Sequence, residues 1–184
     1  MTTSLLTLYW VLYFAIHSLL ATDTIKVLAK SKTPSIFPYY RIAYNVIAIV
    51  GLAVLLRFTL PLASLSADTF IGGVITGIGL LFIVLAFRAF NLREFLGFQT
   101  ETKSELVVTG MYRFVRHPLY FGTMIFIAGL YLLMPSHMML YVLVISYVYI
   151  WVGSRLEERK LRALFGESYS NYAKKVKSLI PYIY

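Results

Sequence analysis

The chain has 184 residues, of which 59% are hydrophobic and 14% are charged, and its mean hydropathy is +0.75. Soluble globular domains contain about 45–50% apolar and about 25% charged residues, so this composition excludes a water-soluble domain and indicates an integral membrane protein. The formal charge is +9 and cysteine is absent, which excludes disulfides, thiolate zinc sites and a cysteine nucleophile.

Five apolar stretches predict an all-α integral membrane protein with about five transmembrane helices. The third contains Gly73 and Gly77, a spacing that allows close approach of a neighbouring helix. The last two are short for a bilayer, which needs about 20 residues per helix, and only three residues join them, so we expect a helical hairpin. We treat the chain as one membrane domain, with three helices in residues 1–90 and a polar loop, the hairpin and a C-terminal segment in 91–184. The stretches cover residues 5–20, 42–62, 70–87, 119–134 and 138–152.

Basic residues alternate from loop to loop and predict the orientation. From the N-terminus through the four loops to the C-terminal tail, Lys and Arg number 0, 4, 1, 5, 0 and 7. Cytoplasmic segments carry the excess of Lys and Arg, so the N-terminus is expected outside and the C-terminus in the cytoplasm. This topology, with attraction to anionic membrane lipids, accounts for the positive charge without a nucleic-acid partner.

Polar residues gather on the predicted cytoplasmic side, first in the loop of residues 91–117. The loop ends at Arg116 and His117, and Pro118 follows. Proline suits the first turn of a helix because it lacks an N–H that would be unpaired there. The unpaired amides and the positive dipole at such a helix start favour a carboxylate or another anion nearby.

A second group of charges, residues 155–160, follows the fifth apolar stretch directly. The simplest interpretation is a solvated helix end with salt bridges. The hairpin, however, brings its two ends together, so Arg116 and His117 are expected beside Glu157 and Glu158. An acid, a base and a cation then meet at one site on the membrane surface.

The C-terminal tail repeats apolar residues at helical spacing from residue 161 to residue 176. If the fifth helix continues into this tail, Glu158 and Arg162 pair at a spacing of four residues. The pattern is interrupted at Phe165 and Gly166, which predicts two short cytosolic amphipathic helices.

The sequence motifs of several classes of soluble enzymes are absent from the chain. There is no Gly-x-Gly-x-x-Gly, no P-loop and no Gly-x-Ser-x-Gly sequence. No two histidines share a helix face, so we expect no metal site. Any cofactor must therefore occupy an atypical site at the membrane edge.

Several motifs follow one another in the C-terminal half. They are the run from Gly110 to Gly122 around Arg116-His117-Pro118, the pair Glu157-Glu158, the sequence Phe165-Gly166-x-x-Tyr169-x-x-Tyr172, and the ending Ile180-Pro181. Across residues 106–184 the chain thereby resembles the isoprenylcysteine carboxyl methyltransferase and phospholipid methyltransferase superfamily. In the N-terminal half, His17-Ser18-Leu19-Leu20-Ala21 and Tyr40-Arg41-x-x-Tyr44-Asn45 are similar to a bacterial branch with methanethiol S-methyltransferase-like and NnrU-like proteins.

The resemblance implies S-adenosylmethionine as the cofactor, held by the polar loop, the hairpin and the C-terminal segment. It implies that His117, Tyr120 and Glu158 hold the amino-acid and sulfonium end, and that backbone at residues 106–108 holds the adenine. It makes Arg116 and Glu157 the candidate catalytic residues, which orient or activate the acceptor. The implied cofactor-binding set is Leu106, Val107, Val108, Tyr112, Arg113, His117, Tyr120 and Glu158.

The implied reaction is methyl transfer to a small or hydrophobic acceptor in a membrane, by resemblance a bacterial inner membrane. A thiol or a lipid amine must lose a proton, which Glu157 can take if burial raises its pKa, or His117 if it stays neutral. An isoprenylcysteine-like carboxylate needs only Arg116 to orient it. These residues therefore leave the acceptor atom open.

Two other functions fit parts of the pattern. Membrane reductases of the NADPH-dependent sterol type share an Arg-His-Pro element, but they carry a His-Arg-x-x-Arg-Asp stretch and a cysteine near the position of Leu164, which this chain lacks. A non-enzymatic membrane protein that keeps the fold is the other alternative. His17 has two interpretations as well, a place beside the acceptor or a hydrogen bond between helices.

Overall fold

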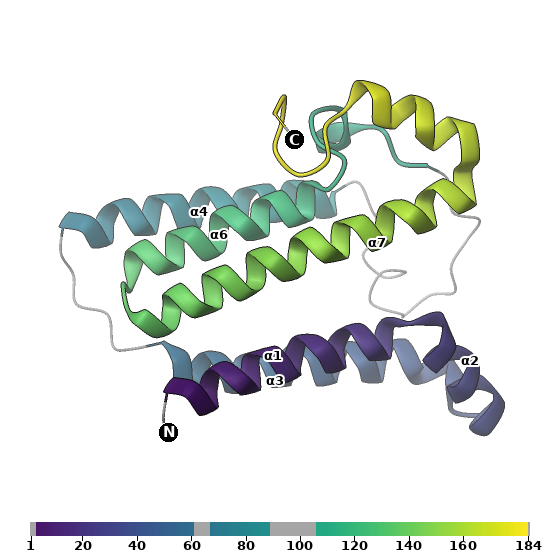
Figure 1. Ribbon diagram of the computed structural model, residues 1–184, viewed down its shortest axis with the longest axis horizontal. Helices are drawn as coiled ribbons and strands as arrows, with labels where there is room; N and C mark the ends of the chain where they lie inside the picture. Colours follow the sequence, from purple (N-terminus) through teal and green to yellow (C-terminus); the bar gives the residue numbers. More distant parts are fainter. Residues whose placement is uncertain (1–2, 61–66, 89–105, 184) are drawn as a thin grey trace. The chain divides into compact units, whose positions relative to one another are not determined.

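The computed structural model describes residues 3–60, 67–88 and 106–183, and every regular element in these ranges is a helix. They form two compact units (Figure 1). The N-terminal unit contains α1 (Thr3–Ala21), α2 (Asp23–Lys32), the 3-10 helix η1 (Phe37–Tyr39) and α3 (Tyr40–Thr59). The C-terminal unit contains α4 (Ala67–Phe87), the 3-10 helix η2 (Gly110–Arg113), α6 (Pro118–Leu133) and α7 (His137–Lys175).

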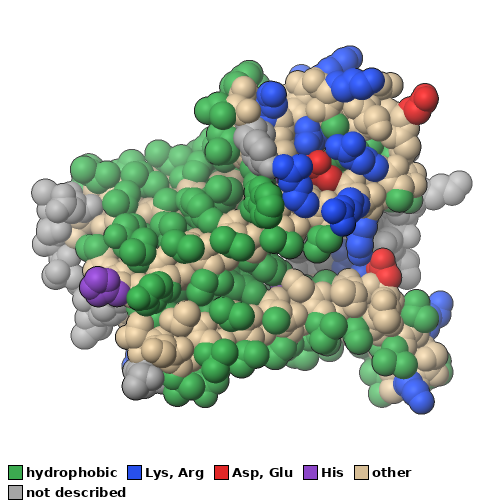
Figure 2. Space-filling model, in the orientation of Figure 1, with side chains coloured by type: hydrophobic (Ala, Val, Ile, Leu, Met, Phe, Trp, Pro, Cys, Tyr) green, Lys and Arg blue, Asp and Glu red, His purple; other side chains and the backbone are tan. Residues whose placement is uncertain are grey.

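The predicted all-α membrane fold is confirmed. Within the described ranges, four helical segments are long and apolar enough to cross a membrane, namely Thr3–Ala21, Phe37–Thr59, Thr69–Phe87 and His137–Lys175. The sixteen residues of α6 rise about 24 Å, less than the roughly 30 Å of a hydrocarbon core. Figure 2 shows hydrophobic side chains along α4, α6 and α7, with Lys and Arg gathered over η2 and the C-terminal part of α7. The count of about five crossings and the single domain remain predictions.

The N-terminal unit is an antiparallel pair of α1 and α3. Near one end, the buried indole Nε1 of Trp10 donates to Thr59 Oγ1 at 2.9 Å. Further along, the hydroxyl of Tyr13 donates to the carbonyl of Ala48 at 3.0 Å. Buried polar groups must find partners away from water, so these bonds fix how the two helices meet.

Helix α2 lies between the first two apolar stretches, where the apolar pattern predicts a loop. Thr22 caps it, since its Oγ1 accepts from the Ile25 amide at 3.4 Å, and Asp23 occupies the first turn. Lys30 and Lys32 occupy the last turn, where cations interact well with the helix dipole. These start and stop signals are visible in the sequence, but they enclose no long apolar stretch, so the apolar pattern does not predict this helix.

Helices α4 and α6 approach each other at backbone distance through glycines. A side chain at Gly72 or Gly79 would collide with the backbone of α6, and one at Gly129 would collide with the backbone of α4. The predicted pair is wrong: a Cβ at Gly73 would touch only one side chain, at 3.9 Å, and one at Gly77 would meet nothing within 4 Å. The contact involves this helix as predicted, but its glycines on α4, Gly72 and Gly79, lie seven residues apart, so a search for glycines four residues apart does not find them.

Helices α6 and α7 form the predicted hairpin, and α7 runs further than its apolar stretch. Ser136 caps α7, with its Oγ accepting from the Met139 amide at 3.1 Å. The helix continues without interruption to Gly166, where a φ of 55° and ψ of −122° turn the chain. Only glycine adopts a positive φ readily, so the predicted interruption is confirmed. Residues 155–165, however, extend α7 instead of forming a separate short helix.

Candidate functional site

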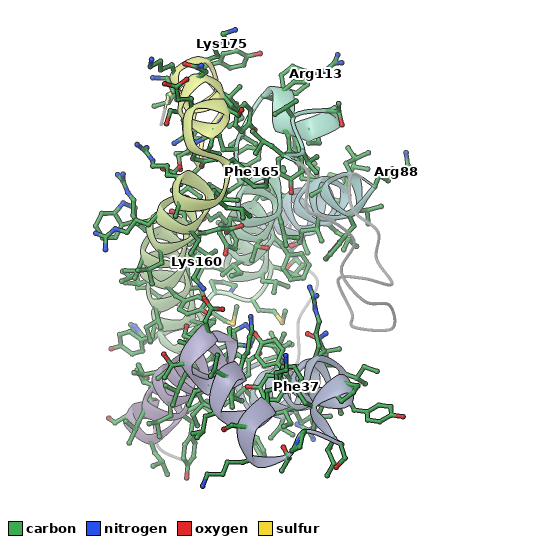
Figure 3. All side chains as sticks on the ribbon, turned by 90° about the vertical axis from the view of Figure 1, so that its right-hand side faces the viewer. Phe37, Arg88, Arg113, Lys160, Phe165 and Lys175 are labelled. Atoms are coloured by element: carbon green, nitrogen blue, oxygen red, sulfur yellow. The ribbon has the colours of Figure 1, made fainter. Side chains whose placement is uncertain are left out.

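The segment that precedes α6 carries six of the residues predicted to bind the cofactor, of which Tyr112 and His117 are buried. Leu106 and Val107 are half-buried, while Val108 and Arg113 are exposed. Figure 3 shows Arg113 and Lys175 projecting outward at the same end of the C-terminal unit. The role of these residues in binding the cofactor stays a prediction. Residues 91–105 of the predicted loop lie outside the described residues.

A short parallel pairing joins this segment to the C-terminal tail. Val115 and Lys177 form a parallel bridge. Directly after Val115, the Arg116 amide donates to the Lys177 carbonyl at 2.8 Å and the His117 amide donates to the Ser178 carbonyl at 3.1 Å. The pairing brings Ser178, which the sequence analysis did not single out, beside the start of α6.

Glu158 lies at the end of the buried face of α7. Before the turn at Gly166, it is the last of a series of buried side chains at helical spacing, Met139, Val142, Ser146, Ile150, Ser154 and Glu158. The face carries uncharged side chains until Glu158, where it becomes ionic. Because charged residues are almost never buried without partners, the contacts of Glu158 decide whether this end of the helix is stable.

Arg116 and Ser178 supply those contacts. The Nε of Arg116 donates to Glu158 Oε1 at 3.0 Å, its Nη2 donates to the same oxygen, and Ser178 Oγ donates to it at 2.8 Å. The Nη1 of Arg116 donates to the carbonyl of Ala173 at 3.0 Å and to the carbonyl of Val176. One guanidinium therefore joins the start of α6, the middle of α7 and the tail.

The ring of His117 lies between the two glutamates. Its Nδ1 is 3.5 Å from Glu157 Oε2, and its Nε2 is 3.4 Å from Glu158 Oε1. The ring stacks on Tyr120 with 5.4 Å between centroids. The His117 and Glu158 side chains are 3% and 6% exposed, whereas Glu157 is 46% exposed. The two glutamates thus differ, one fixed inside the cluster and the other open to its surroundings.

Two buried polar atoms beside Glu158 have no hydrogen-bond partner within the described residues. They are His117 Nε2 and the hydroxyl of Tyr169. Tyr169 is 1% exposed, and the charges of Glu158 and Arg116 both act on it. Unpaired buried polar groups are uncommon in proteins and call for a ligand or a water molecule. Both atoms are thus available to a bound polar group.

Two further tyrosines brace this cluster from the outside. The hydroxyl of Tyr172 donates to the backbone carbonyl of Tyr112 at 2.6 Å, and its ring meets that of Tyr169 edge to face. Burial raises the pKa of Tyr172 and Tyr112. Tyr172 therefore acts as a neutral donor that connects the tail helix after Gly166 to η2.

The charges hold both glutamates in the ionised form. Burial works to raise the pKa of Glu158, but hydrogen bonds from Arg116 and Ser178 and the Arg116 charge leave it below its ordinary value. Burial acts on Glu157 in the same direction and is outweighed by the hydrogen bond and the charge of His117, so its pKa is also lowered. To act as a base near neutral pH, Glu157 would need a pKa raised by burial, and its pKa is lowered instead.

The structure brings together five of the predicted site residues: Arg116, His117, Tyr120, Glu157 and Glu158. The predicted contact between Glu158 and Arg162 is confirmed, with 3.7 Å between Oε2 and Nη2. Tyr112 joins the group through Tyr172. Tyr169 and Ser178 had no predicted role. The sequence feature that could have identified Tyr169 is its place three residues after Gly166 and three before Tyr172. No local sequence pattern indicates Ser178.

Comparisons with known proteins agree with the resemblance found in the motifs. The family model described as phospholipid methyltransferase matches residues 67–168, more than half of the chain. A protein named methanethiol S-methyltransferase from Crocosphaera subtropica is 33% identical over 105 residues, which are 55% of this chain and 40% of that protein.

Two further relatives carry related names. Methanethiol S-methyltransferase 1 from Bradyrhizobium diazoefficiens is 32% identical over 55% of this chain and 36% of its own length. A probable protein-S-isoprenylcysteine O-methyltransferase from Oryza sativa subsp. indica is 33% identical over 56% of this chain and 53% of its own length. The chain thus spans about half, or less, of the curated relatives it matches. No solved structure matches it.

Proposed function

The chain belongs to the phospholipid methyltransferase family, and from that membership we propose that it is an S-adenosylmethionine-dependent methyltransferase of a membrane. One observation carries the proposal: two carboxylates and a histidine meet at the start of α6, and the buried His117 Nε2 and Tyr169 hydroxyl beside them have no hydrogen-bond partner within the described residues. When bound, S-adenosylmethionine supplies a methyl group on a positively charged sulfonium.

The residues of the cluster fit such a group. Glu158 and Glu157 carry lowered pKa values and stay negative at neutral pH, so they favour a cation nearby. The first turn of α6 offers backbone amides to a carboxylate. His117 and Tyr169 offer the buried polar atoms. Tyr120 stacks on His117 and holds the orientation of its ring.

Arg116 acts in this proposal as a positioning residue. Its donors are directed to Glu158 and to the carbonyls of Ala173 and Val176, so it fixes the carboxylate and the tail. Glu157 is the glutamate open to its surroundings, which suits a group that faces the acceptor. Backbone at residues 106–108 receives the adenine. Alignment and exclusion of water supply most of the acceleration, because the reaction neutralises charge.

A small apolar thiol is the acceptor that we propose. Its support is the printed names of the bacterial relatives, which describe methanethiol S-methyltransferases. The thiol proton leaves, a new bond forms between the acceptor sulfur and the methyl carbon, and the bond from that carbon to the sulfonium sulfur breaks. A thioether, S-adenosylhomocysteine and one proton result. His117, with its ring beside Glu157, is the group we assign to take the proton.

The orientation in the membrane follows from the basic residues. Figure 2 shows Lys and Arg concentrated at one end of the C-terminal unit, and the cytoplasmic side of a membrane protein carries that excess. We therefore propose a bacterial inner membrane protein with its N-terminus outside and its donor site facing the cytoplasm, where S-adenosylmethionine would be available.

The experiment is a transfer assay on the purified full-length chain in lipid nanodiscs. It uses S-adenosylmethionine with a deuterated methyl group and a series of alkanethiols, and mass spectrometry of the headspace detects the labelled thioether. We expect labelled product with short thiols, and turnover lowered about a hundredfold in Glu157→Ala, because its carboxylate faces Nδ1 of the His117 ring that takes the proton. The matched control is Glu167→Ala, an exposed glutamate on the same helix. A folded protein that labels no thiol contradicts the proposed acceptor.

A further inference from the structure

The last part of the tail contacts the buried cluster along one side. The carbonyls of Ala173 and Val176 accept from Nη1 of Arg116, and Ser178 Oγ donates to Glu158 Oε1 at 2.8 Å. All of these bonds end on the buried ion pair between Arg116 and Glu158. This side of the tail is therefore fixed from within the C-terminal unit.

Three exposed lysines alternate with those residues, namely Lys174, Lys175 and Lys177, and we call them the tail lysines. Figure 3 shows Lys175 projecting outward at the same end of the C-terminal unit as Arg113, and Figure 2 shows Lys and Arg gathered there. Residues 168–184 contain no Asp or Glu. The outer side of the tail is therefore a positive surface without acidic side chains of its own.

The length of α7 places the tail lysines at the level of the lipid headgroups. From its start at His137 to Glu158, the helix rises about 32 Å, close to the roughly 30 Å of a hydrocarbon core. The turn at Gly166 brings the tail back to this level, where Ser178 contacts Glu158. The tail lysines can therefore reach lipid phosphates while α7 crosses the bilayer.

Apolar side chains adjoin the tail lysines. The chain turns directly after them, where the Ile183 amide donates to the carbonyl of Ile180 at 3.2 Å. This turn leaves Tyr182 80% and Ile183 75% exposed, and Phe114, beside the bridge residue Val115, is exposed too. A surface with basic and apolar side chains matches the boundary between headgroups and acyl chains. An acidic soluble partner would satisfy the lysines but leave the apolar side chains in water.

We propose that the tail lysines bind the phosphate groups of anionic membrane lipids, and that this binding holds the tail against Arg116 and Glu158. The backbone that carries the lysines also carries the inner contacts, so fixing the ammonium groups restricts the same residues that close the cluster. A ligand that binds only the ordered tail stabilises it, and the ordered cluster in turn favours the ligand. The lipid contact itself does not depend on methyl transfer.

The first test measures lipid binding by the full-length protein in an uncharged detergent. Native mass spectrometry follows the binding of phosphatidylglycerol, and phosphatidylcholine of the same chain length measures binding by apolar contact alone. The test variant combines Lys174→Gln, Lys175→Gln and Lys177→Gln. Each basic residue at a membrane surface contributes about fivefold in affinity for anionic lipid, so we expect this variant to bind phosphatidylglycerol about a hundredfold more weakly. Equal affinity of the wild type for both lipids overturns the proposal.

A matched control removes the same charge from α2. The combined variant Lys26→Gln, Lys30→Gln and Lys32→Gln also loses three positive charges, but Lys26 lies 3.7 Å from Asp23 and Lys30 lies over the Phe37 ring. We expect a loss of less than about fivefold. An equal loss in the two variants would indicate attraction by net charge. Displacement of the lipid by an equal concentration of inorganic phosphate would indicate a site for free anions, and either result overturns the proposal.

Unfolding temperatures test the link between the lipid and the cluster. We expect phosphatidylglycerol to raise the wild-type unfolding temperature by about 5 °C relative to phosphatidylcholine. The variant with Gln in place of the tail lysines should lose this gain and unfold like wild type when no lipid is added. The charge-conserving combination Lys174→Arg, Lys175→Arg and Lys177→Arg should keep it. An equal gain in the Gln variant, or none in wild type, overturns the proposal.

Binding of S-adenosylhomocysteine separates this inference from the proposed function, on which this last effect rests. We expect about tenfold tighter binding in nanodiscs of phosphatidylglycerol than in nanodiscs of phosphatidylcholine, and no such difference in the Gln variant. Equal affinity in both membranes overturns the link between lipid and cluster and leaves the methyltransferase standing. A protein that binds no S-adenosylhomocysteine but is stabilised by phosphatidylglycerol through the tail lysines keeps the lipid site and refutes the proposed function.

Discussion

The two units hold their polar groups in opposite ways. In the C-terminal unit, Arg116, His117, Glu158 and Ser178 come from three separate parts of the chain and contact one another closely. In the N-terminal unit, His17 and Tyr44 form one polar pair at an apolar cavity. The first arrangement suits a large, charged and polar ligand, since fixed charges lose little freedom when it binds. The second presents one polar pair in an otherwise apolar lining.

The largest expected effect comes from removing Glu158. Glu158→Ala leaves the buried guanidinium of Arg116 without its carboxylate, and breaking a buried ion pair costs about 3–5 kcal/mol. We expect a large fall in the midpoint of thermal unfolding in detergent and loss of affinity for S-adenosylhomocysteine. Glu157→Ala, at the exposed glutamate, is expected to unfold near the wild-type temperature. Equal unfolding temperatures for the two variants contradict the difference between the glutamates.

The contact between α4 and α6 gives the next largest effect. Gly129→Ala places a methyl group against the backbone of α4, and overpacking of this kind costs about 1–3 kcal/mol. The comparison variant is Gly77→Ala, where the new Cβ meets nothing within 4 Å and the change is expected to be within about 0.5 kcal/mol. If Gly77→Ala proved the more damaging variant, the register of the two helices described here would be wrong.

Ser178 provides a more local test of the tail. Ser178→Ala removes one hydrogen bond to the buried Glu158, a loss of about 1.5–3 kcal/mol because the acceptor is charged. Ser170→Ala is the matched control, since Ser170 Oγ is exposed and bonds only within its own helix turn. We expect the first variant to lower both the unfolding temperature and the affinity for S-adenosylhomocysteine. A change in neither would show that the tail does not hold the cluster.

The pH dependence of stability tests the ionised state of the two glutamates in the C-terminal unit. Glu157 and Glu158 have a folded pKa below the ordinary value of 4.5, so their stabilising effect is complete above that value. It is lost as the pH falls through the lowered folded pKa. Unfolding temperatures of wild type and Glu158→Gln, measured from pH 7 to pH 3, should differ by a constant amount down to about pH 4.5 and then converge. A gap that begins to close near neutrality contradicts the lowered pKa.

Much of the fold could be predicted because apolar length and charge are local properties of the sequence. The five apolar stretches correspond to helices, and the short link of residues 135–137 correctly predicted the hairpin. The meeting of Arg116 and His117 with Glu157 and Glu158 followed from that hairpin alone. In each case the information lay within one helix or one turn.

Features that depend on contacts between residues far apart in the sequence could not be predicted. The bridge between Val115 and Lys177 joins segments far apart in the chain and involves a single residue pair, which has no periodic signal. The same pairing brings in Ser178 and directs the Nη1 of Arg116 to the tail. The choice between Gly72 and Gly73 depended on which face of α4 meets α6, and an apolar helix with little amphipathic asymmetry does not reveal it.

The central claim is that the cluster at the start of α6 binds S-adenosylmethionine, and calorimetric titration of the full-length protein with S-adenosylhomocysteine tests it most directly. The account predicts saturable binding by wild type and by Glu167→Ala, loss of binding in the combined variant His117→Ala and Glu158→Ala, and no binding of NADPH. A folded wild-type protein that binds NADPH and not S-adenosylhomocysteine would contradict the account.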